Sequence, residues 1–292
     1  MQIKYYIQAT VAKVFLTSYK LAGIRVGSYL GGRLGRFLGR IVPEGKLAAK
    51  NLALAFPDLS EAQIRQINAN MWTHLGRMTG EFPHMKQVVE QADQRFDFEG
   101  LEHLEAAMAA GKSPIILSGH FSNWEMTMVG IGKFVGRTGS LYRRANNPYM
   151  EEWITRQRGA IMPIQIGKGS AGARKMIKLV QSGTSIVALV DQRLNTGDPI
   201  EFMGRATKAP SAFTKLARKH QLPIVMTRII RRTDGPDNAY FKQIFYPAFY
   251  APQTDNMQAD IDATMRQVYD YFEDWIRERP EDWFWAHNRW LD

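Results

Sequence analysis

The chain has 292 residues, of which 45% are hydrophobic and 23% charged, a globular composition that excludes global disorder. It contains no cysteine, which excludes disulfides, thiolate zinc sites and a cysteine nucleophile. The net charge of +10 is uneven, because residues 1–50 hold nine basic residues and one acid, whereas the other 242 hold 29 basic and 27 acidic residues.

Residues 1–45 form a basic, apolar arm in which short apolar runs alternate with single positive charges. No uncharged stretch reaches the roughly 18 residues of a transmembrane helix, and the charges argue against a cleavable signal peptide. The pattern predicts an amphipathic helix on an anionic membrane surface. Glycines at every fourth position would let another helix or a lipid approach closely, so packing on the protein's own body is an alternative, as is nucleic-acid binding. These glycines are Gly23, Gly27, Gly31, Gly35 and Gly39.

Residues 46–292 are expected to form the main domain, with a helical lead-in over 46–93 and an alternation of strands and helices over 94–292. In the lead-in, Ser60 and Gln63 have the spacing of a capping box. The alternation indicates an α/β fold with a central, largely parallel sheet flanked by helices. The expected strands are 115–118, 139–143, 162–166, 185–191, 224–231 and 240–246. The expected helices are 100–110, 123–135, 148–158, 170–182, 211–220 and 258–278.

His120 follows the apolar stretch "SPIILSG" and precedes Glu125 by five residues. At the end of a buried strand it would lie where open α/β sheets place their ligand sites. Five residues of continuous helix separate two side chains by about 140°, so the two residues can pair only if His120 lies in the turn before the helix. Such a pair would abstract a proton from a hydroxyl, with Glu125 orienting the imidazole. The spacing alone also fits a corner histidine and a solvent-facing glutamate.

Polar and cationic residues follow other expected strands, at the edge of the sheet that presents His120. Arginine and lysine there suit phosphate groups, and each residue taken singly also fits a solvated surface position. The residues are Arg143, Asn147, Asp191, Gln192, Arg193, Arg205 and Lys208.

Rival chemistries lack the residues they need. Ser118 and Ser122 stand outside a G-x-S-x-G elbow, which argues against a serine esterase. "IGKGSAGARK" lacks the glycine spacing of a phosphate-binding loop. The six histidines show no H-x-H or H-E-x-x-H pairing, so no metal site is expected. A membrane or nucleic-acid binder without enzymatic activity would account for the arm but not for the polar residues.

Six blocks, in this order, resemble the late (secondary) acyltransferases of lipid A biosynthesis, within the lysophospholipid acyltransferase-like superfamily. They are "NLALAFPDLS", "SGHFSNWE", "YRRANNP", "VDQR", "FMGRATKAPSAFTKLA" and "RPEDWFWAHNRW". The chain departs from the family pattern around Thr207, whose register is changed, and at His287-Asn288-Arg289, where the family has His-Arg-Arg. The charged arm also replaces a clearer transmembrane segment, which puts spanning in doubt.

The resemblance implies a glycerolipid acyltransferase-like fold and transfer of an acyl chain from acyl carrier protein to a hydroxyl of an anionic glycolipid, a lipid A precursor. His120 would be the general base and Glu125 its orienting partner, with no acyl-enzyme and no cofactor. Arg143 would stabilise the oxyanion or bind phosphate, and Asp191 and Gln192 would support the site. The other cations would hold phosphates of the acceptor or of the donor's phosphopantetheine.

The expected location is the cytoplasmic face of the bacterial inner membrane, peripheral or with a single anchor, and no nucleic-acid partner is expected. Acylation of a lysophospholipid or an amino-acid lipid remains an alternative, as does a membrane-associated thioesterase. The acyl chain length is left open by the sequence.

Overall fold

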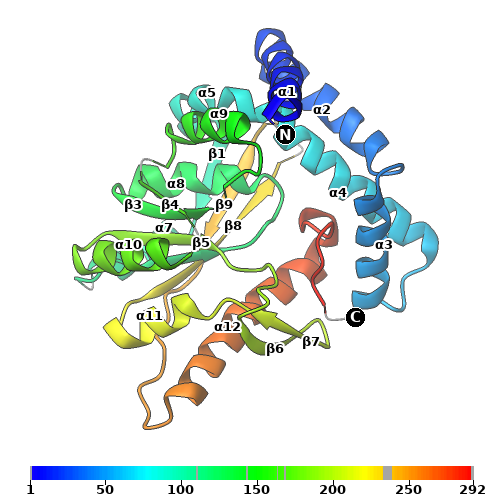
Figure 1. Cartoon of the computed structure of the whole chain (residues 1–292). Coiled ribbons are helices and arrows are strands. Elements are labelled where there is room, and N and C mark those ends of the chain that lie inside the picture. Colours follow the sequence, from blue (N-terminus) through cyan, green and yellow to red (C-terminus); the bar gives the residue numbers. More distant parts are fainter. Residues whose placement is uncertain are drawn as a thin grey trace.

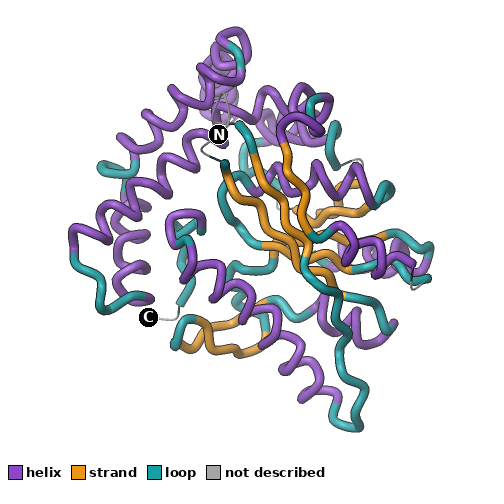
Figure 2. The backbone as a smooth tube through the Cα atoms, turned by 180° about the vertical axis from the view of Figure 1, so that it is seen from behind, coloured by secondary structure: helices purple, strands orange, loops and turns teal. Residues whose placement is uncertain are grey.

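The computed structural model describes residues 2–109, 111–142, 144–162, 164–167, 169–232 and 239–290. A twisted seven-stranded sheet lies at the centre, with helices on both faces (Figures 1 and 2). The strand order is β1-β9-β8-β2-β5-β3-β4, and every neighbouring pair is parallel except β8 and β9. The fold is therefore α/β with a largely parallel sheet. The strands are β1 (Phe96–Glu99), β2 (Ile115–Ser118), β3 (Thr138–Tyr142), β4 (Ile164–Gly167), β5 (Ser185–Leu189), β8 (Ile224–Arg231) and β9 (Phe241–Phe245).

Alternate side chains of the central strands enter two separate cores, as the pleat of a strand requires. Ile115 and Leu117 pack with α10 (Ser170–Gln181), α11 (Ala212–His220) and α12 (Met257–Glu278) on one face. Ile116, on the opposite face, packs with α5 (Met85–Glu90), α7 (Leu101–Ala109) and α8 (Thr127–Phe134). Strands that are buried on both faces have continuous apolar sequences, and the runs "IIL" at 115–117 and "IVAL" at 186–189 lie in two of the predicted strands.

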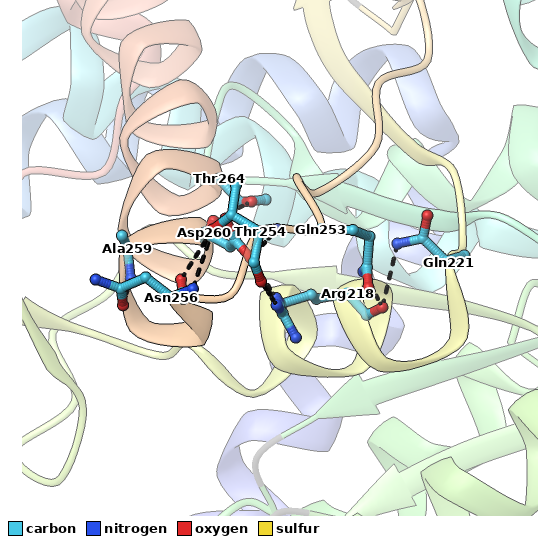
Figure 3. A network of polar contacts seen from close by, with 8 residues as sticks. All are labelled: Arg218, Gln221, Gln253, Thr254, Asn256, Ala259, Asp260 and Thr264. Atoms are coloured by element: carbon cyan, nitrogen blue, oxygen red, sulfur yellow. Dashed lines mark hydrogen bonds and ion pairs between the residues drawn. The ribbon is translucent and has the colours of Figure 1, made fainter.

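Polar contacts fix the start of α12 against the end of α11 (Figure 3). Asn256 caps α12 by accepting a hydrogen bond from the backbone N–H of Ala259 at 3.0 Å. The Asp260 carboxylate accepts hydrogen bonds from Arg218 Nε of α11 at 2.7 Å and from the backbone N–H and hydroxyl of Thr254. The long helix is thus held in register across the sheet, and its far end delivers the C-terminal segment to the edge where β2 and β5 end.

The N-terminal arm consists of two helices rather than one. α1 (Gln2–Ala22) and α2 (Ile24–Leu38) meet at Gly23, whose φ of 83° breaks the helix. A Cβ atom on Gly31 would lie 2.3 Å from the carbonyl oxygen of Gly76, and one on Gly27 would lie 2.8 Å from that of Gly80. The glycine stripe therefore packs α2 against α4 (Glu61–Glu81), the arrangement in which the arm contacts the protein's own body.

The remaining helices lie at several places along the chain, from α3 after the arm to η3 after α12. The capping box at the start of α4 is present, since Ser60 accepts from the Gln63 backbone while the Gln63 side chain accepts from the Ser60 N–H. Among the described residues, no helix is both long and apolar enough to cross a bilayer. These helices are α3 (Pro43–Ala55), η1 (Phe82–His84), α6 (Ala92–Arg95), η2 (Trp124–Met126), α9 (Pro148–Arg158) and η3 (Pro280–Asp282).

Two features were not predicted. β1 lies at the edge of the sheet as a short "FDFE" segment, and β6 (Asp198–Phe202) and β7 (Arg205–Ala209) form a separate antiparallel hairpin. The hairpin lies away from the main sheet, near α12 (Figure 1). It moves Arg205 and Lys208, expected near the strand ends, into a two-stranded element.

Candidate active site

The site is built where β2 and β5 end side by side. The two strands are parallel, with Ser118 opposite Leu189, and the Val190 N–H donates to the Ser118 carbonyl at 3.0 Å. Parallel neighbours carry their following residues to the same edge of a sheet, so His120 and Asp191 become neighbours although 71 residues separate them.

Asp191 binds His120 through both of its carboxylate oxygens. Oδ1 lies 2.7 Å from His120 Nδ1, and Oδ2 accepts from the His120 backbone N–H at 2.9 Å and from Trp283 Nε1 at 2.8 Å. Burial by itself would raise the pKa of this fully buried carboxyl, but the charge and hydrogen bonds of His120 hold the pKa well below its ordinary value. Asp191 is therefore ionised and only accepts, so in the neutral form of the imidazole Nδ1 carries the hydrogen and Nε2 has the lone pair.

Glu125 pairs with Arg158, at the end of α9, and not with His120. Its carboxylate accepts from Arg158 Nε at 2.9 Å and from Nη2. Burial lowers the pKa of Arg158, but the hydrogen bonds and charge of Glu125 outweigh it and raise that pKa above its ordinary value. The expectation that Glu125 orients the imidazole does not match this geometry, because Asp191 already occupies Nδ1. Glu125 instead lies in the middle of the 3-10 helix η2, after the histidine, and its carboxylate faces α9.

Aromatic rings enclose the histidine. The Trp124 ring packs edge-on against His120 with centroids 5.1 Å apart, and Phe284 lies 5.6 Å from Trp124. The Phe284 N–H donates to the His120 carbonyl at 2.9 Å, which ties the C-terminal segment to the turn. His287, three residues further on, is neutral, because burial lowers its pKa to about 4.

A cavity of about 870 Å³ opens beside His120. This volume lies within the range of ligand pockets. His120, Glu125 and Arg158 provide polar groups in its wall, and most of the remaining wall is apolar. An apolar cavity with a few convergent polar groups suits a molecule with a long hydrocarbon part and one reacting polar end. Its apolar walls come from α8, α9, α10, α11 and the sheet, and they include Met128, Leu141, Met150, Trp153, Ile154, Met162, Met176 and Phe213.

Two of the other predicted residues also line the cavity, namely Gln192 and Arg193. Arg193 Nη1 donates to the Trp290 carbonyl at 3.0 Å, and its Nε donates to Asn195. Both therefore stand within the same site as His120, at the end of β5.

The remaining predicted residues lie elsewhere. Asn147 caps α9, accepting from the Tyr149 and Met150 N–H groups, and donates to the Tyr5 carbonyl. Arg205 and Lys208 lie on β7 of the β6–β7 hairpin, where Arg205 donates to the Leu54 carbonyl and the Lys208 carbonyl accepts from Arg289. Among the described lining residues neither cation appears. Arg143 lies outside the described residues.

Sequence reasoning missed Arg158 and Trp283 as partners of the site. Arg158 stands 33 residues after Glu125, on a helix that was predicted without any role for this arginine, and no local spacing connects the two residues. Trp283 stood in the quoted block "RPEDWFWAHNRW", but a tryptophan there reads as core until its indole N–H is seen to reach Asp191.

Comparisons with known proteins indicate the family of the chain. The family model described as bacterial lipid A biosynthesis acyltransferase matches residues 2–292. A lipid A biosynthesis acyltransferase of Haemophilus influenzae is 25% identical over 93% of this chain and 83% of its own. A phosphatidylinositol mannoside acyltransferase of Mycobacterium tuberculosis is 23% identical over 66% of this chain and 59% of its own. The crystal structure of a 1-acyl-sn-glycerophosphate acyltransferase from Thermotoga maritima, at 12% identity, gives a TM-score of 0.40 over 95% of this chain and 99% of its own.

Proposed function

The chain belongs to the bacterial lipid A biosynthesis acyltransferase family, and on that premise we propose that His120 is the general base that moves an acyl chain from a carrier-protein thioester to a lipid hydroxyl. That the chain is an acyltransferase acting on a lipid follows from its family and relatives. The base, the acyl carrier protein donor and an anionic lipid A precursor as acceptor are the content of the proposal.

The observation that carries the proposal is the contact between His120 Nδ1 and Asp191 at 2.7 Å, beside the cavity. Because Nδ1 is occupied, Nε2 accepts the proton of the lipid hydroxyl as its oxygen attacks the thioester carbonyl. The ionised Asp191 stabilises the imidazolium that forms. The carrier's thiolate then leaves with the proton from Nε2, so a single transfer completes the reaction without an acyl-enzyme.

Charge in the cavity wall supports this chemistry. Arg158 lines the cavity, and its pairing with Glu125 fixes the guanidinium plane. A fixed cation beside the reacting carbonyl stabilises the developing oxyanion. Arg193, which also lines the cavity, suits a phosphate of the acceptor or of the donor. The role given to Arg143 stays a prediction from the resemblance.

Mass spectrometry of the products tests the proposal. The protein is incubated with carrier-protein thioesters and, in separate reactions, a lipid A precursor, a lysophospholipid and an amino-acid lipid. We expect acylation of the lipid A precursor by the native protein, and loss of that product in His120→Ala with the fold retained. Near-normal turnover in His120→Ala would refute the mechanism, acylation of another lipid would replace the acceptor, and release of free fatty acid would indicate a thioesterase.

We also infer that the arm acts at a membrane surface, and the location predicted for it stays the cytoplasmic face of the inner membrane. α1 leaves a row of apolar side chains exposed, among them Ile3, Ile7, Val11 and Val14 at 77%, 56%, 64% and 67%. Such a row beside basic residues suits the interface of an anionic bilayer. The helix that carries this row also reaches the site, because Leu16 of α1 lines the cavity.

Flotation with vesicles tests the arm without disturbing the fold. Val11→Asp and Val14→Asp place charges on exposed positions, so we expect normal unfolding curves and weaker binding to anionic vesicles. Met257→Asp is the matched control, because Met257 is similarly exposed at 59% but stands at the start of α12. Equal binding by the α1 variants and the control would exclude α1 as the membrane contact.

A further inference from the structure

A buried carboxylate outside the catalytic cavity lies directly behind the turn that carries His120. Glu81, at the end of α4, is fully buried and accepts four hydrogen bonds from three other parts of the chain. Ser28 Oγ of α2 donates to Oε1 at 2.6 Å. Arg231 of β8 donates to Oε1 from Nη1 at 2.5 Å and to Oε2 from Nη2 at 2.9 Å. The fourth donor is Asn123 Nδ2, 2.7 Å from Oε2.

Asn123 belongs to the turn between His120 and Glu125. Its own backbone carbonyl accepts from the Met126 N–H at 3.0 Å, so it starts the 3-10 turn that carries Glu125. The bond to Glu81 therefore connects a buried, charge-balanced centre to the segment between the two functional side chains.

The same turn is strained. Ser122 has φ of 50°, in the left-handed region that costs a non-glycine residue about 1–2 kcal/mol. Its N–H donates to the Asp282 carbonyl at 2.6 Å. A strained conformation persists only when its surroundings hold it. The contacts to Asp282 and Glu81 hold it from two sides, and the Glu81 contact uses the side chain of Asn123, the residue that follows Ser122.

We propose that Glu81 is a positioning residue for acyl transfer: its carboxylate, neutralised by Arg231, holds Asn123 and thereby sets the turn that places His120 and Glu125 at the cavity. The proposal rests on the proposed role of His120. Glu81 itself touches no substrate in this scheme, and Arg231 allows its charge to remain buried. The bond from Ser28 satisfies the other side of the same carboxylate without contacting the turn.

Two matched variants separate positioning from simple stabilisation. Asn123→Ala and Ser28→Ala each remove one hydrogen bond from the Glu81 carboxylate, on opposite sides of it. We expect similar shifts of the urea midpoint in both. The kcat of Asn123→Ala should fall about 10- to 100-fold, since a displacement of about 1 Å costs that much in rate. Its KM and the pH dependence of kcat should change little, because the cavity and the His120–Asp191 contact remain. Ser28→Ala should keep kcat within about twofold.

A polarity swap gives a second test. Glu81→Gln with Asn123→Asp re-forms the hydrogen bond in reverse, with the glutamine amide donating to the new carboxylate, and it keeps one negative charge near Arg231. The amide replaces the oxygen that accepts from Arg231 Nη2, so this donor must turn to the new carboxylate. We expect the double variant to recover kcat at least tenfold over the slower single variant. Equal kcat losses in Asn123→Ala and Ser28→Ala, or no recovery in the swap, would overturn the positioning role.

The native protein and His120→Ala are assayed alongside. Absence of transfer by the native protein, or normal transfer by His120→Ala, would count against the proposed function itself. Normal native activity, an inactive His120→Ala and indistinguishable Asn123→Ala and Ser28→Ala variants would remove the role of Glu81 alone.

Discussion

Replacing Asp191 by asparagine should invert the tautomer of His120 while leaving the fold in place. Three N–H donors point at the carboxylate: His120 Nδ1, the His120 backbone and the Trp283 indole. An asparagine has one oxygen to offer them. If that oxygen takes the Oδ2 position, it serves two of the donors, and the amide NH₂ then faces Nδ1. If it takes the Oδ1 position, the NH₂ opposes two N–H groups.

The first orientation is favoured because it leaves no buried N–H without a partner, which would cost about 1–3 kcal/mol for each group. It forces Nδ1 to accept and Nε2 to carry the hydrogen. The imidazole can then no longer take a proton from the lipid hydroxyl. We expect kcat to fall by about 10²- to 10⁴-fold, the contribution of a general base, or roughly 3–5 kcal/mol in the barrier.

The assay is single-turnover acyl transfer, with the tautomer read from the ring nitrogens of ¹⁵N-labelled histidine and the fold from urea unfolding. Asp191→Ala is the control, since it strands all three donors and should lose both stability and rate. An Asp191→Asn variant with native turnover, or with Nε2 still unprotonated, would refute the assignment of Asp191 as the group that sets the tautomer.

Three further predictions concern stability and use urea unfolding. Arg158→Met should cost about 3–5 kcal/mol because it leaves the Glu125 carboxylate buried without its partner, and Glu125→Leu in the same chain should recover most of that loss; additive losses would contradict the pairing. Burial lowers the pKa of His287 to about 4 in the folded protein, whereas the same side chain has a pKa near 6.5 in the unfolded chain. As the pH falls from 6.5 towards 4, the unfolded chain binds a proton that the folded protein does not, so the free energy of unfolding decreases. Between pH 7 and 5 this group should cost the native protein about 2 kcal/mol, and His287→Gln should lose that part of the slope; an unchanged slope would refute the assignment. Gly31→Ala should destabilise the fold because its Cβ meets the backbone of α4 at 2.3 Å, whereas Gly132→Ala, with its nearest contact at 3.8 Å, should be neutral or stabilising by up to about 1 kcal/mol; equal effects would contradict the close packing of α2.

Much of the fold could be predicted because local patterns determine it. The apolar run before His120 became β2, and the start of α9 at Pro148 and its end at Arg158 matched the prediction, whereas Asn147, predicted as a site residue, is the N-cap of this helix. β1 was missed because "FDFE" is too short and too polar to show a period, and it forms only by pairing with β9. The β6–β7 hairpin was missed because its turn residues, Met203 and Gly204, lie at the start of the block "FMGRATKAPSAFTKLA", whose first residues were predicted to form neither strand nor helix.

The glycine stripe shows where a pattern stops short of a partner. Repetition at every fourth position indicated a surface of close approach, but both a lipid and a helix satisfy that condition. What decided it was a second pair of glycines, Gly76 and Gly80, placed on α4 with the spacing that lets two backbones meet. Neither sequence segment alone contains that information.

The candidate site shows the same limit in chemical terms. His120 does precede the helix, as pairing with Glu125 would have required, but the spacing could not assign the two carboxylates, because the sequence does not show which strands are neighbours. Because β2 and β5 are neighbours, the imidazole of His120 contacts Asp191, and because α9 ends beside the turn, Glu125 contacts Arg158. The motif therefore carries two separate polar units on one turn, an imidazole held by Asp191 and a carboxylate that holds Arg158. One turn fixes the distance between them, and under the positioning role proposed for Glu81 this distance is what its hydrogen bond from Asn123 maintains.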